Sequence, residues 1–432
     1  MNRRLFLGSL AASALAQGPA PRVNGARLRN HLEALSVFGR PAGGTFADGV
    51  SRIAYSDADV AGRRYAMSLM EAAGLKPRID AAGNISAIRA GTDPSLPPVL
   101  FGSHIDSVPS GGNFDGDLGS LAAIEVVQTL NEAGVRTRRP LEVVIWCNEE
   151  GFAYNNGLNG SRAAAGLLEL GGLDVVWSGV KKVDALRKVG GNPDRIEAAK
   201  REPGSCHCYL ELHIEQGGTL EEAGVPVGVV EGIVAIDRYE VEIRGFANHA
   251  GTTPMPKRHD ALLAASYLTV SVNQIVRNEP GRQVGTVGQL SVSPNSPNVV
   301  PGFVKLTVEL RDLSAAKIAG LADRISARAK EIGAQTQTEV TMRRVSHHAE
   351  ALATPDVQAS IEATAKKLKV QSTRLPSGAG HDAQAMATLF PMGMIFIPSI
   401  GGISHSPKEL SSWEHCTLGA DVLLNTVLTW AL

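Results

Sequence analysis

Seven histidine and acidic residues of this sequence follow apolar segments or stand in glycine-rich loops, where side chains can converge on one site. They are His104, Asp106, Asp115, Glu149, Glu150, His213 and His405. Taken singly, each is explained as a hydrogen-bonded loop residue. Two neighbouring metal ions, however, need mixed imidazole and carboxylate ligands, with one carboxylate that bridges the ions. Together these residues therefore predict a dinuclear metal centre, whose typical chemistry is metal-assisted hydrolysis.

Two adjacent glutamates, Glu149 and Glu150, follow the apolar segment 141–146. Successive side chains of a strand point to opposite sides, so the two neighbours cannot share one role. One can bind metal while the other faces a water molecule as general base. A solvated acidic loop is the alternative. Enclosing such a pair without a cation would be costly, which favours the metal interpretation for an enclosed site.

The loop 111–116 surrounds Asp115 with glycines. Glycine lets the backbone approach a metal ion closely, which suits a bridging carboxylate at this position. The sequence contains no Gly-x-Ser-x-Gly elbow, no His-Glu-x-x-His pair and no P-loop. The serine-hydrolase, zincin and nucleotide-binding interpretations therefore lack the residues that they need.

The segments around these residues predict an α/β unit. A short apolar strand at 99–101 runs into the segment 102–106, and a helix over 118–133 precedes the next strand at 141–146. Strand, loop, helix and strand in this order are typical of a mostly parallel sheet. In such sheets ligands bind at the carboxyl ends of the strands, which is where the polar residues stand.

The pattern changes after a strand predicted at 209–213. Half-exposed strands and two helices follow, at 225–234, 238–244, 260–276, 285–292, 304–310 and 315–332. Their order predicts a small α+β insert with an antiparallel sheet. We therefore expect an α/β catalytic domain, with a mixed, mostly parallel sheet, made of residues 22–225 and 336–432. Residues 226–335 would form the inserted domain.

Length and composition limit the class of protein. A chain of 432 residues is too long for one ordinary core and suggests two domains. The net charge is −1 and no long run of Lys or Arg occurs, which argues against nucleic acid as a partner. No segment after the N-terminus stays apolar for the roughly 18 residues that a membrane span requires.

Four cysteines, at positions 147, 206, 208 and 416, are too few for a disulfide scaffold in a chain of this length. Cys206 and Cys208 are separated by one residue and no second pair follows, so they do not predict a metal site. The sequence leaves the disulfide state of Cys206 and Cys208 open.

The first 16 residues predict an export signal. Arg3 and Arg4 precede a short apolar run that ends at Ala14-Leu15-Ala16, a small-residue cleavage pattern. Twin arginines before Phe-Leu are typical of twin-arginine export, which predicts a periplasmic or otherwise exported protein. The alternative is the basic N-terminus of a cytoplasmic enzyme, and cleavage of the segment is left open.

Eight short runs, spread in order over almost the whole mature chain, carry a family resemblance. They are GSHIDSVP (102–109), GGNFDG (111–116), NEEG (148–151), ELHIEQG (211–217), NHAGTTPM (248–255), PNVVP (297–301), SGAGHDA (377–383) and GISHSP (402–407). In these runs the sequence resembles the metallopeptidase-like M20-type dinuclear-metal amidohydrolases of the hydantoinase/carbamoylase branch. That branch contains N-carbamoyl-L-amino-acid hydrolases, β-ureidopropionases and allantoate amidohydrolases.

The resemblance implies two divalent metal ions per subunit. His104 and His213 would bind one ion, Glu150 and His405 the other, and Asp115 would bridge the two. Zinc is the first expectation for the metal, and manganese, cobalt and nickel suit the same ligands.

The resemblance also implies roles beside the ions. Asp106 would orient His104 from behind, and Glu149 would be the general base. His213 followed by Ile-Glu-Gln-Gly resembles the ureido-cleaving branch, because peptidase relatives more often place a carboxylate there.

Substrate contacts are implied at Gln216, His249, Asn298, Arg311 and His381. Arg311 suits a carboxylate because its guanidinium is a permanently charged planar fork, and a surface ion pair with Asp312 is the alternative. His249 would stabilise the developing oxyanion and would reach the site of a partner subunit. The family therefore implies a homodimer formed through the insert, which would act as a lid and dimerisation domain.

The implied reaction is hydrolysis of a linear amide bond in a small N-carbamoyl substrate such as an N-carbamoyl-L-amino acid. The products would be ammonia, carbon dioxide and the amino acid. Within the same fold, the alternatives are an allantoate amidohydrolase and an aminoacylase or dipeptidase. Outside enzymes, the alternative is an exported binding protein that has lost turnover, although every metal and base position is filled. The sequence does not predict the substrate side chain.

Overall fold

The computed structural model describes residues 20–432, apart from the side chains of residues 170 and 171. The predicted export segment, residues 1–16, lies outside the described residues. The chain divides into two compact units. Unit 1 contains the described residues up to Val230 together with Ala353–Leu375 and His381–Leu432, and unit 2 contains Glu231–Leu352 and Pro376–Gly380.

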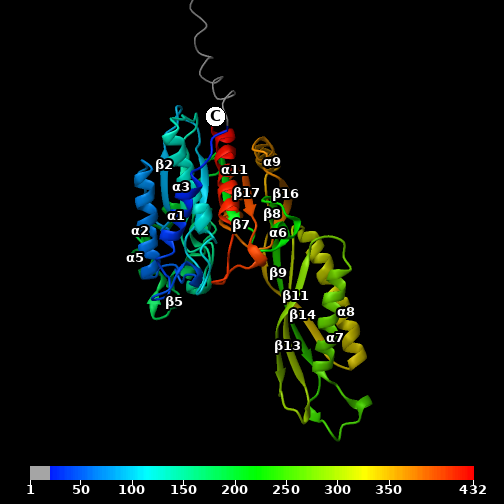
Figure 1. Ribbon diagram of the computed structural model, residues 1–432. Helices are drawn as coiled ribbons and strands as arrows, with labels where there is room; N and C mark the ends of the chain where they lie inside the picture. The colour runs from blue at the N-terminus through cyan, green and yellow to red at the C-terminus, as the bar shows by residue number, and fades with distance from the viewer. Residues whose placement is uncertain (1–19) are drawn as a thin grey trace, which may run out of the picture. The chain divides into compact units, whose positions relative to one another are not determined.

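Most of a nine-stranded mixed sheet lies in unit 1 (Figure 1). Its strands, in spatial order, are β1 (Arg78–Ile79), β2 (Ile85–Arg89), β4 (Leu141–Trp146), β3 (Val99–His104), β7 (Cys208–Ile214), β17 (Met392–Ile397), β8 (Val227–Ile233) and β15 (Ala351–Leu352), and β16 (Ser372–Ser377) pairs with β8. β4, β3, β7 and β17 pair in parallel, whereas the outer pairs β1–β2, β2–β4, β17–β8 and β8–β15 are antiparallel. The predicted α/β class with a mixed sheet is therefore confirmed, with the parallel pairs at its centre.

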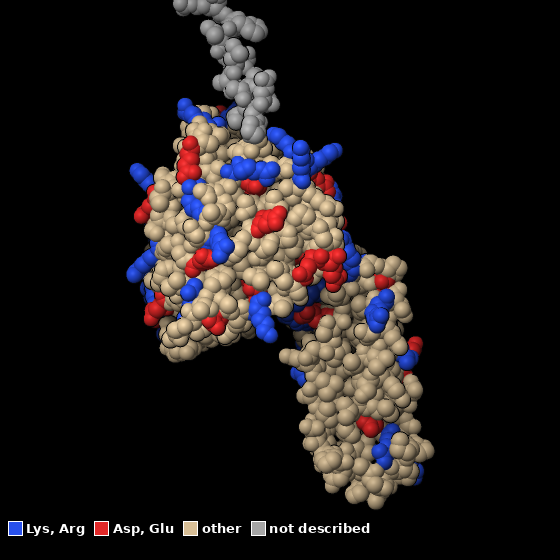
Figure 2. Space-filling model, in the orientation of Figure 1, with Lys and Arg blue, Asp and Glu red and all other residues tan. Residues whose placement is uncertain are grey.

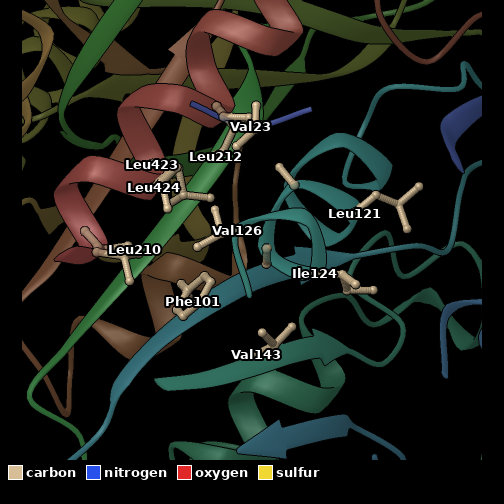
Figure 3. Close-up of a cluster of buried hydrophobic side chains, with 14 of the residues drawn as sticks. Val23, Phe101, Leu121, Ile124, Val126, Val143, Leu210, Leu212, Leu423 and Leu424 are labelled. Carbon is tan, nitrogen blue, oxygen red and sulfur yellow. The ribbon is translucent and has the colours of Figure 1, made fainter. Parts of the chain in front are cut away.

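The four central strands are buried along their whole length, as apolar strands covered on both faces must be. The main helices of unit 1 are α1 (Gly25–Leu35), α2 (Asp57–Ala72), α3 (Asp117–Glu132), α9 (Pro355–Lys367) and α11 (Trp413–Ala431). Short helices α4 (Asn159–Ala164), α5 (Lys182–Lys188), α6 (Thr219–Ala223) and α10 (Asp382–Met386) lie in the connections. Figure 3 shows side chains of α3 and α11 in one buried cluster with those of the strands, among them Val126, Leu423 and Leu424 near Phe101 and Leu210. Each such buried side chain contributes about 1.5–3 kcal/mol, so this core fixes the strand ends that carry the polar residues.

A buried arginine ties the end of β3 to the beginning of α3. Arg52 has no exposed surface, and its guanidinium pairs with Asp117, the first residue of α3. Its Nε donates to the carbonyl of Ile105 at 2.6 Å, and its Nη1 donates to the carbonyl of Phe38 at 2.9 Å. Because a buried charge must be paired and fully hydrogen-bonded, this residue fixes the loop between β3 and α3.

Unit 2 is a four-stranded antiparallel sheet with two helices. The elements are β9 (Ala235–Arg244), α7 (Ala261–Arg277), β11 (Val284–Ser293), β13 (Phe303–Asp312), α8 (Ala315–Thr336) and β14 (Glu339–His348), with strand order β11-β13-β9-β14. Burial alternates along β9 and β13, since one face of the sheet packs on the helices. A short ribbon of β10 (Asn248–His249) and β12 (Val299–Val300) completes the unit.

The inserted domain was expected to end at residue 335, but the compact unit 2 continues to Leu352. The reason is β14, which pairs with β9 along its whole length, so that Met342 faces Val241 across the ladder. Residues 339–348 therefore complete the small sheet and do not belong with the rest of the expected segment 336–432.

The surface of the larger unit carries both signs of charge. On the face shown in Figure 2, Lys and Arg side chains are interspersed with Asp and Glu, with no continuous basic area. All four cysteines are buried and free. Within the described part of the chain, every helix is too short or too polar to span a bilayer.

Candidate metal centre

The five predicted metal ligands converge at the carboxyl ends of the central strands. His104 ends β3 and His213 lies near the end of β7. Glu150 follows β4, Asp115 lies just before α3, and His405 lies between β17 and α11. Neighbouring parallel strands end at the same edge of a sheet, which is why these distant residues meet.

Asp115 stands between two groups of ligands. Its Oδ1 lies 3.5 Å from Nε2 of His104 and 3.2 Å from Nε2 of His213. Its Oδ2 lies 3.3 Å from Nε2 of His405, which in turn lies 3.3 Å from Oε2 of Glu150. Each group presents three possible ligand atoms close enough to share one ion. One carboxylate facing two such groups is the arrangement that a bridged metal pair requires.

The two inner histidines present the same nitrogen to Asp115. Nδ1 of His104 lies 3.0 Å from the backbone oxygen of Asp106, and Nδ1 of His213 lies 2.9 Å from that of Ile214. A carbonyl can only accept, so each Nδ1 carries a hydrogen, which leaves Nε2 as the nitrogen that can offer a lone pair to a metal ion. Consistently, Nε2 of His213 accepts the backbone N–H of Gly116 at 3.2 Å. Both rings are thus oriented as metal ligands.

Asp106 acts on the neighbouring turn more than on His104. Its carboxylate accepts the backbone N–H groups of Glu149 at 3.1 Å and of Glu150 at 3.2 Å. The same carboxylate is 3.9 Å from Nδ1 of His104, which bonds to the backbone oxygen of Asp106 instead. Asp106 therefore links the end of β3 to the turn that presents both glutamates.

The two glutamates point to different sides of the centre. Oε2 of Glu149 lies 3.7 Å from Nε2 of His104, whereas Oε2 of Glu150 lies beside His405. Glu150 belongs to a ligand group with Asp115, and Glu149 belongs to none. Glu150 therefore lies where it could hold an ion, and Glu149 lies beside the same cluster but outside that group.

The electrostatics of this cluster fit a bound cation. Burial raises the pKa of Glu150 to about 8, with Asp115 adding to the shift, and burial raises the pKa of Glu149 well above its usual range against the attraction of His104. Burial also opposes ionisation of Asp115, yet the three histidines around it hold its pKa well below the usual range. Oε1 of Glu150 is buried with no hydrogen-bond partner among the described residues. Divalent ions would compensate this excess of buried acid, and imidazole with carboxylate suits first-row metals.

Two predicted substrate residues of unit 1 contact the ligands themselves. Gln216 has a left-handed backbone, with φ of 60°, and its Nε2 donates to Oδ2 of Asp115 at 2.6 Å. The ring of His381 packs edge-on against that of His213, with centroids 4.4 Å apart, and is fully buried. Burial and the nearby His213 hold the pKa of His381 well below its usual range, so its ring is neutral.

His249 and Asn298 lie together in unit 2. Nδ1 of His249 accepts the backbone N–H groups of Gly251 and Thr252 at 3.0 and 3.2 Å, so the hydrogen resides on Nε2. The backbone oxygen of Asn298 accepts the N–H of Ala250 at 2.9 Å, across the β10–β12 ribbon. The ribbon thus offers an exposed imidazole N–H donor beside an amide side chain.

Arg311 lies on β13 and is half-buried. Its Nε donates to Glu309 at 2.8 Å and its Nη1 donates to the backbone oxygen of Gly378 at 2.6 Å. Asp312 bonds instead to the N–H of Ser314 and to Lys317, so the alternative pair of Arg311 with Asp312 is not formed.

Sequence reasoning missed Glu211, which forms a third possible ligand group with His213 and His381, and it also missed Glu409. The carboxylate of Glu409 is buried and accepts the backbone N–H of Asp115 at 3.0 Å. Glu409 follows His405 by four residues in a loop rich in Ser and Pro, which is no signal of a buried role. Nothing in its own neighbourhood distinguished it from a solvated acidic residue.

The chain is similar to known proteins over nearly its whole length. The model of Peptidase family M20/M25/M40 matches residues 100–429. An N-carbamoyl-L-amino acid amidohydrolase of Geobacillus stearothermophilus is 42% identical over 411 residues, which cover 95% of this chain and 99% of the relative. A ureidoglycolate hydrolase of Arabidopsis thaliana is 36% identical and covers 94% of this chain and 86% of the relative. The crystal structure of a hydantoinase/carbamoylase family amidase from Burkholderia multivorans superimposes with a TM-score of 0.89 at 35% identity, over 96% of this chain and 99% of that one.

Proposed function

We propose that this chain, which belongs to peptidase family M20/M25/M40, is an amidohydrolase of small N-carbamoyl substrates such as N-carbamoyl-L-amino acids. The products are ammonia, carbon dioxide and the amino acid. The observation that carries this proposal is the position of Asp115 between two ligand groups. The names of similar proteins, N-carbamoyl-L-amino acid amidohydrolases, support the same substrate class. The resemblance found in the sequence runs is confirmed by the family match and by the hydantoinase/carbamoylase structures.

The ligand groups support a site for two divalent ions. His104 and His213 would hold one ion, Glu150 and His405 the other, and Asp115 both. Zinc is our first choice, with manganese, cobalt and nickel as alternatives. When bound, the ions supply Lewis acidity, which lowers the pKa of water and polarises the ureido carbonyl.

Glu149 is the general base of the proposed reaction. Its carboxylate stands beside His104, outside both ligand groups, where it can take a proton from the attacking water. The same carboxyl then delivers that proton to the leaving nitrogen. Asp106 holds the backbone of Glu149, so the base keeps its direction through both transfers.

His249 is the proposed donor to the developing oxyanion. Two backbone N–H groups keep its Nδ1 unprotonated, which leaves the Nε2–H as a donor of fixed tautomer. Such a donor typically contributes about 3 kcal/mol to stabilisation of the transition state. Asn298, which directly precedes β12, Gln216 and His381 are the proposed polar contacts to the rest of the substrate.

Arg311 is proposed to hold the substrate carboxylate, and its replacement tests this. Arg311→Ala is expected to raise KM strongly, and Arg311→Lys should not restore it fully, because an ammonium cannot make the bidentate contact. Arg238→Ala is a matched control, since Arg238 pairs with the same Glu309 from the neighbouring strand. Steady-state kinetics with an N-carbamoyl amino acid measure both. A KM of Arg311→Ala equal to that of the control would remove Arg311 from the site.

A homodimer formed through unit 2 is the second part of the proposal. Leu263, Tyr267 and Val270 stand at i, i+4 and i+7 on α7 and are 41, 41 and 56% exposed, an apolar stripe that a partner would cover. Val270→Glu is expected to shift the protein from dimer to monomer in sedimentation velocity. Val345→Glu on β14 replaces a comparably exposed residue outside the stripe and should leave the dimer intact. A wild-type monomer would contradict the proposal.

Export of the protein is proposed from residues 1–16. Arg3→Lys combined with Arg4→Lys is expected to block translocation, because the twin-arginine pair is the feature that such a pathway reads. Cell fractionation and N-terminal sequencing of the mature protein measure the outcome. An intact N-terminus on cytoplasmic protein would speak for the cytoplasmic alternative.

A substrate panel tests the function directly. Purified protein loaded with each metal in turn is offered N-carbamoyl and N-acetyl forms of the same amino acids, together with ureidopropionate, allantoate and ureidoglycolate. We expect ammonia from ureido compounds and little acetate from the N-acetyl series. Preference for allantoate or ureidoglycolate would favour the activity of an allantoate deiminase or a ureidoglycolate hydrolase, as the plant relatives are named. Preference for N-acetyl compounds would favour an aminoacylase. If none of these compounds is turned over with any metal, the result would favour the alternative of a binding protein.

A further inference from the structure

Glu409 is a buried carboxylate that contacts the loops of two expected metal ligands. Its side chain lies in the loop before α11 and is 4% exposed. Oε1 accepts the backbone N–H groups of Phe114 and of Asp115, both at 3.0 Å. Oε2 accepts the hydroxyl of Ser404 at 2.7 Å. One carboxylate therefore joins the loop of Asp115 to the residue just before His405, across 294 positions of sequence in the case of Asp115.

The surroundings of Glu409 are built to receive an acceptor. A Cβ at Gly112 would stand 2.0 Å from Oε1 of Glu409, so the close approach of this carboxylate requires glycine there. Among the described residues no Lys or Arg forms an ion pair with Glu409, and its contacts are N–H and O–H donors. A buried carboxylate without a cationic side chain is costly unless its hydrogen bonds, or a nearby cation, compensate the charge. Both conditions would be met beside a loaded metal centre.

The hydroxyl of Ser404 extends this connection to the proposed bridge. It lies 3.1 Å from Oδ2 of Asp115 and 2.7 Å from Oε2 of Glu409. The backbone of Asp115 is thus fixed from one side by Glu409, and its outer oxygen is contacted by a residue that Glu409 also holds. Movement of Glu409 would change the direction of Asp115 and the position of the His405 loop together.

We propose that Glu409 is a positioning residue that holds Asp115 and the His405 loop in the relative positions needed to bind the metal pair. The inference rests on the proposed metal site, since it concerns the ligands of that site. Residues that orient metal ligands typically change metal affinity by about ten- to a hundredfold when they are removed. Loss of Glu409 should therefore weaken metal binding although Glu409 is not itself a ligand.

Metal affinity of three variants tests the inference. The probe is Zn²⁺ alone, competed against a chromophoric chelator, with the unfolding temperature of the metal-free protein measured in parallel. Glu409→Ala should raise the Kd for Zn²⁺ by about ten- to a hundredfold. Glu409→Gln keeps an acceptor oxygen for both N–H groups and a donor toward Ser404, so its Kd should stay within about threefold of wild type. Glu409→Asp is one methylene shorter, cannot reach both loops and should resemble Glu409→Ala; it carries the test if the alanine variant does not fold.

Asp421→Ala is the matched control for loss of a buried carboxylate. Asp421 is 3% exposed, accepts the backbone N–H of Val23 and pairs with Arg22, on a segment that carries none of the proposed metal ligands. It should lower the unfolding temperature of the metal-free protein but leave the Kd for Zn²⁺ unchanged. Two ions in the wild type with an unchanged Kd in Glu409→Ala and Glu409→Asp would overturn the positioning role alone. A wild-type protein that binds no metal would overturn the proposed function, and the inference with it.

Discussion

Replacing Glu149 with Gln is expected to stop turnover while both metal ions stay bound. Glu149 lies beside His104 but outside the two ligand groups, so its carboxylate is placed to move protons and not to hold an ion. The amide of Gln is nearly isosteric and cannot accept the proton of the attacking water. Turnover should fall by roughly the 10²–10⁴-fold that general acid–base catalysis supplies, or by more. Affinity for the substrate should change little, which would make the variant suitable for trapping bound substrate in crystals.

Glu150→Gln is the matched comparison, because the two residues are adjacent and share the same backbone support from Asp106. It should lower metal occupancy and activity together, since Glu150 belongs to the ligand group with Asp115 and His405. Elemental analysis and single-turnover kinetics of both variants separate the roles. Loss of metal in Glu149→Gln with full occupancy in Glu150→Gln would invert the assignment. Full occupancy and full turnover in both would place the active site elsewhere.

The parts of the fold that could be predicted from the sequence are those governed by local patterns. The run 141–146, apolar except for Glu142, and the periodic helix after Asp115 predict buried elements, and the structure contains them as β4 and α3. Because parallel strands end at one edge, polar residues such as His104 and Glu150 could be expected to meet there. The distance of Asp115 from each of them depends on packing between segments, so it could not be predicted from the sequence.

The misses have one physical cause, which is that their roles come from contacts distant in sequence. The strand β14 alternates apolar Val340 and Met342 with polar residues, a weak local signal that only pairing with β9 makes decisive. The carboxylate of Asp106 bonds two N–H groups of the turn after β4, a contact that the sequence did not predict, while its backbone oxygen contacts His104. Glu409 likewise acquires its role only when its loop reaches the backbone of Asp115.

Replacing Asp115 with Ala is expected to remove both metal ions, whereas His405→Ala should remove one. Asp115 alone faces both ligand groups, with Oδ1 toward His104 and His213 and Oδ2 toward His405. His405 belongs only to the outer group, and its side chain is 49% exposed, so its loss should cost the fold little. Wild-type protein should contain close to two ions per subunit by elemental analysis.

Activity should follow metal occupancy in this series. Loss of the ions removes several kcal/mol of charge stabilisation, so Asp115→Ala should lose on the order of 10³-fold or more in kcat/KM, and excess metal should not restore it. In His405→Ala excess metal should restore part of the lost activity, because the inner group and the bridge remain. Chelator treatment of the wild type should abolish activity reversibly. If Asp115→Ala kept two ions, or the wild type were active without any, the bridged centre would be wrong, and the convergence of these side chains would need another explanation.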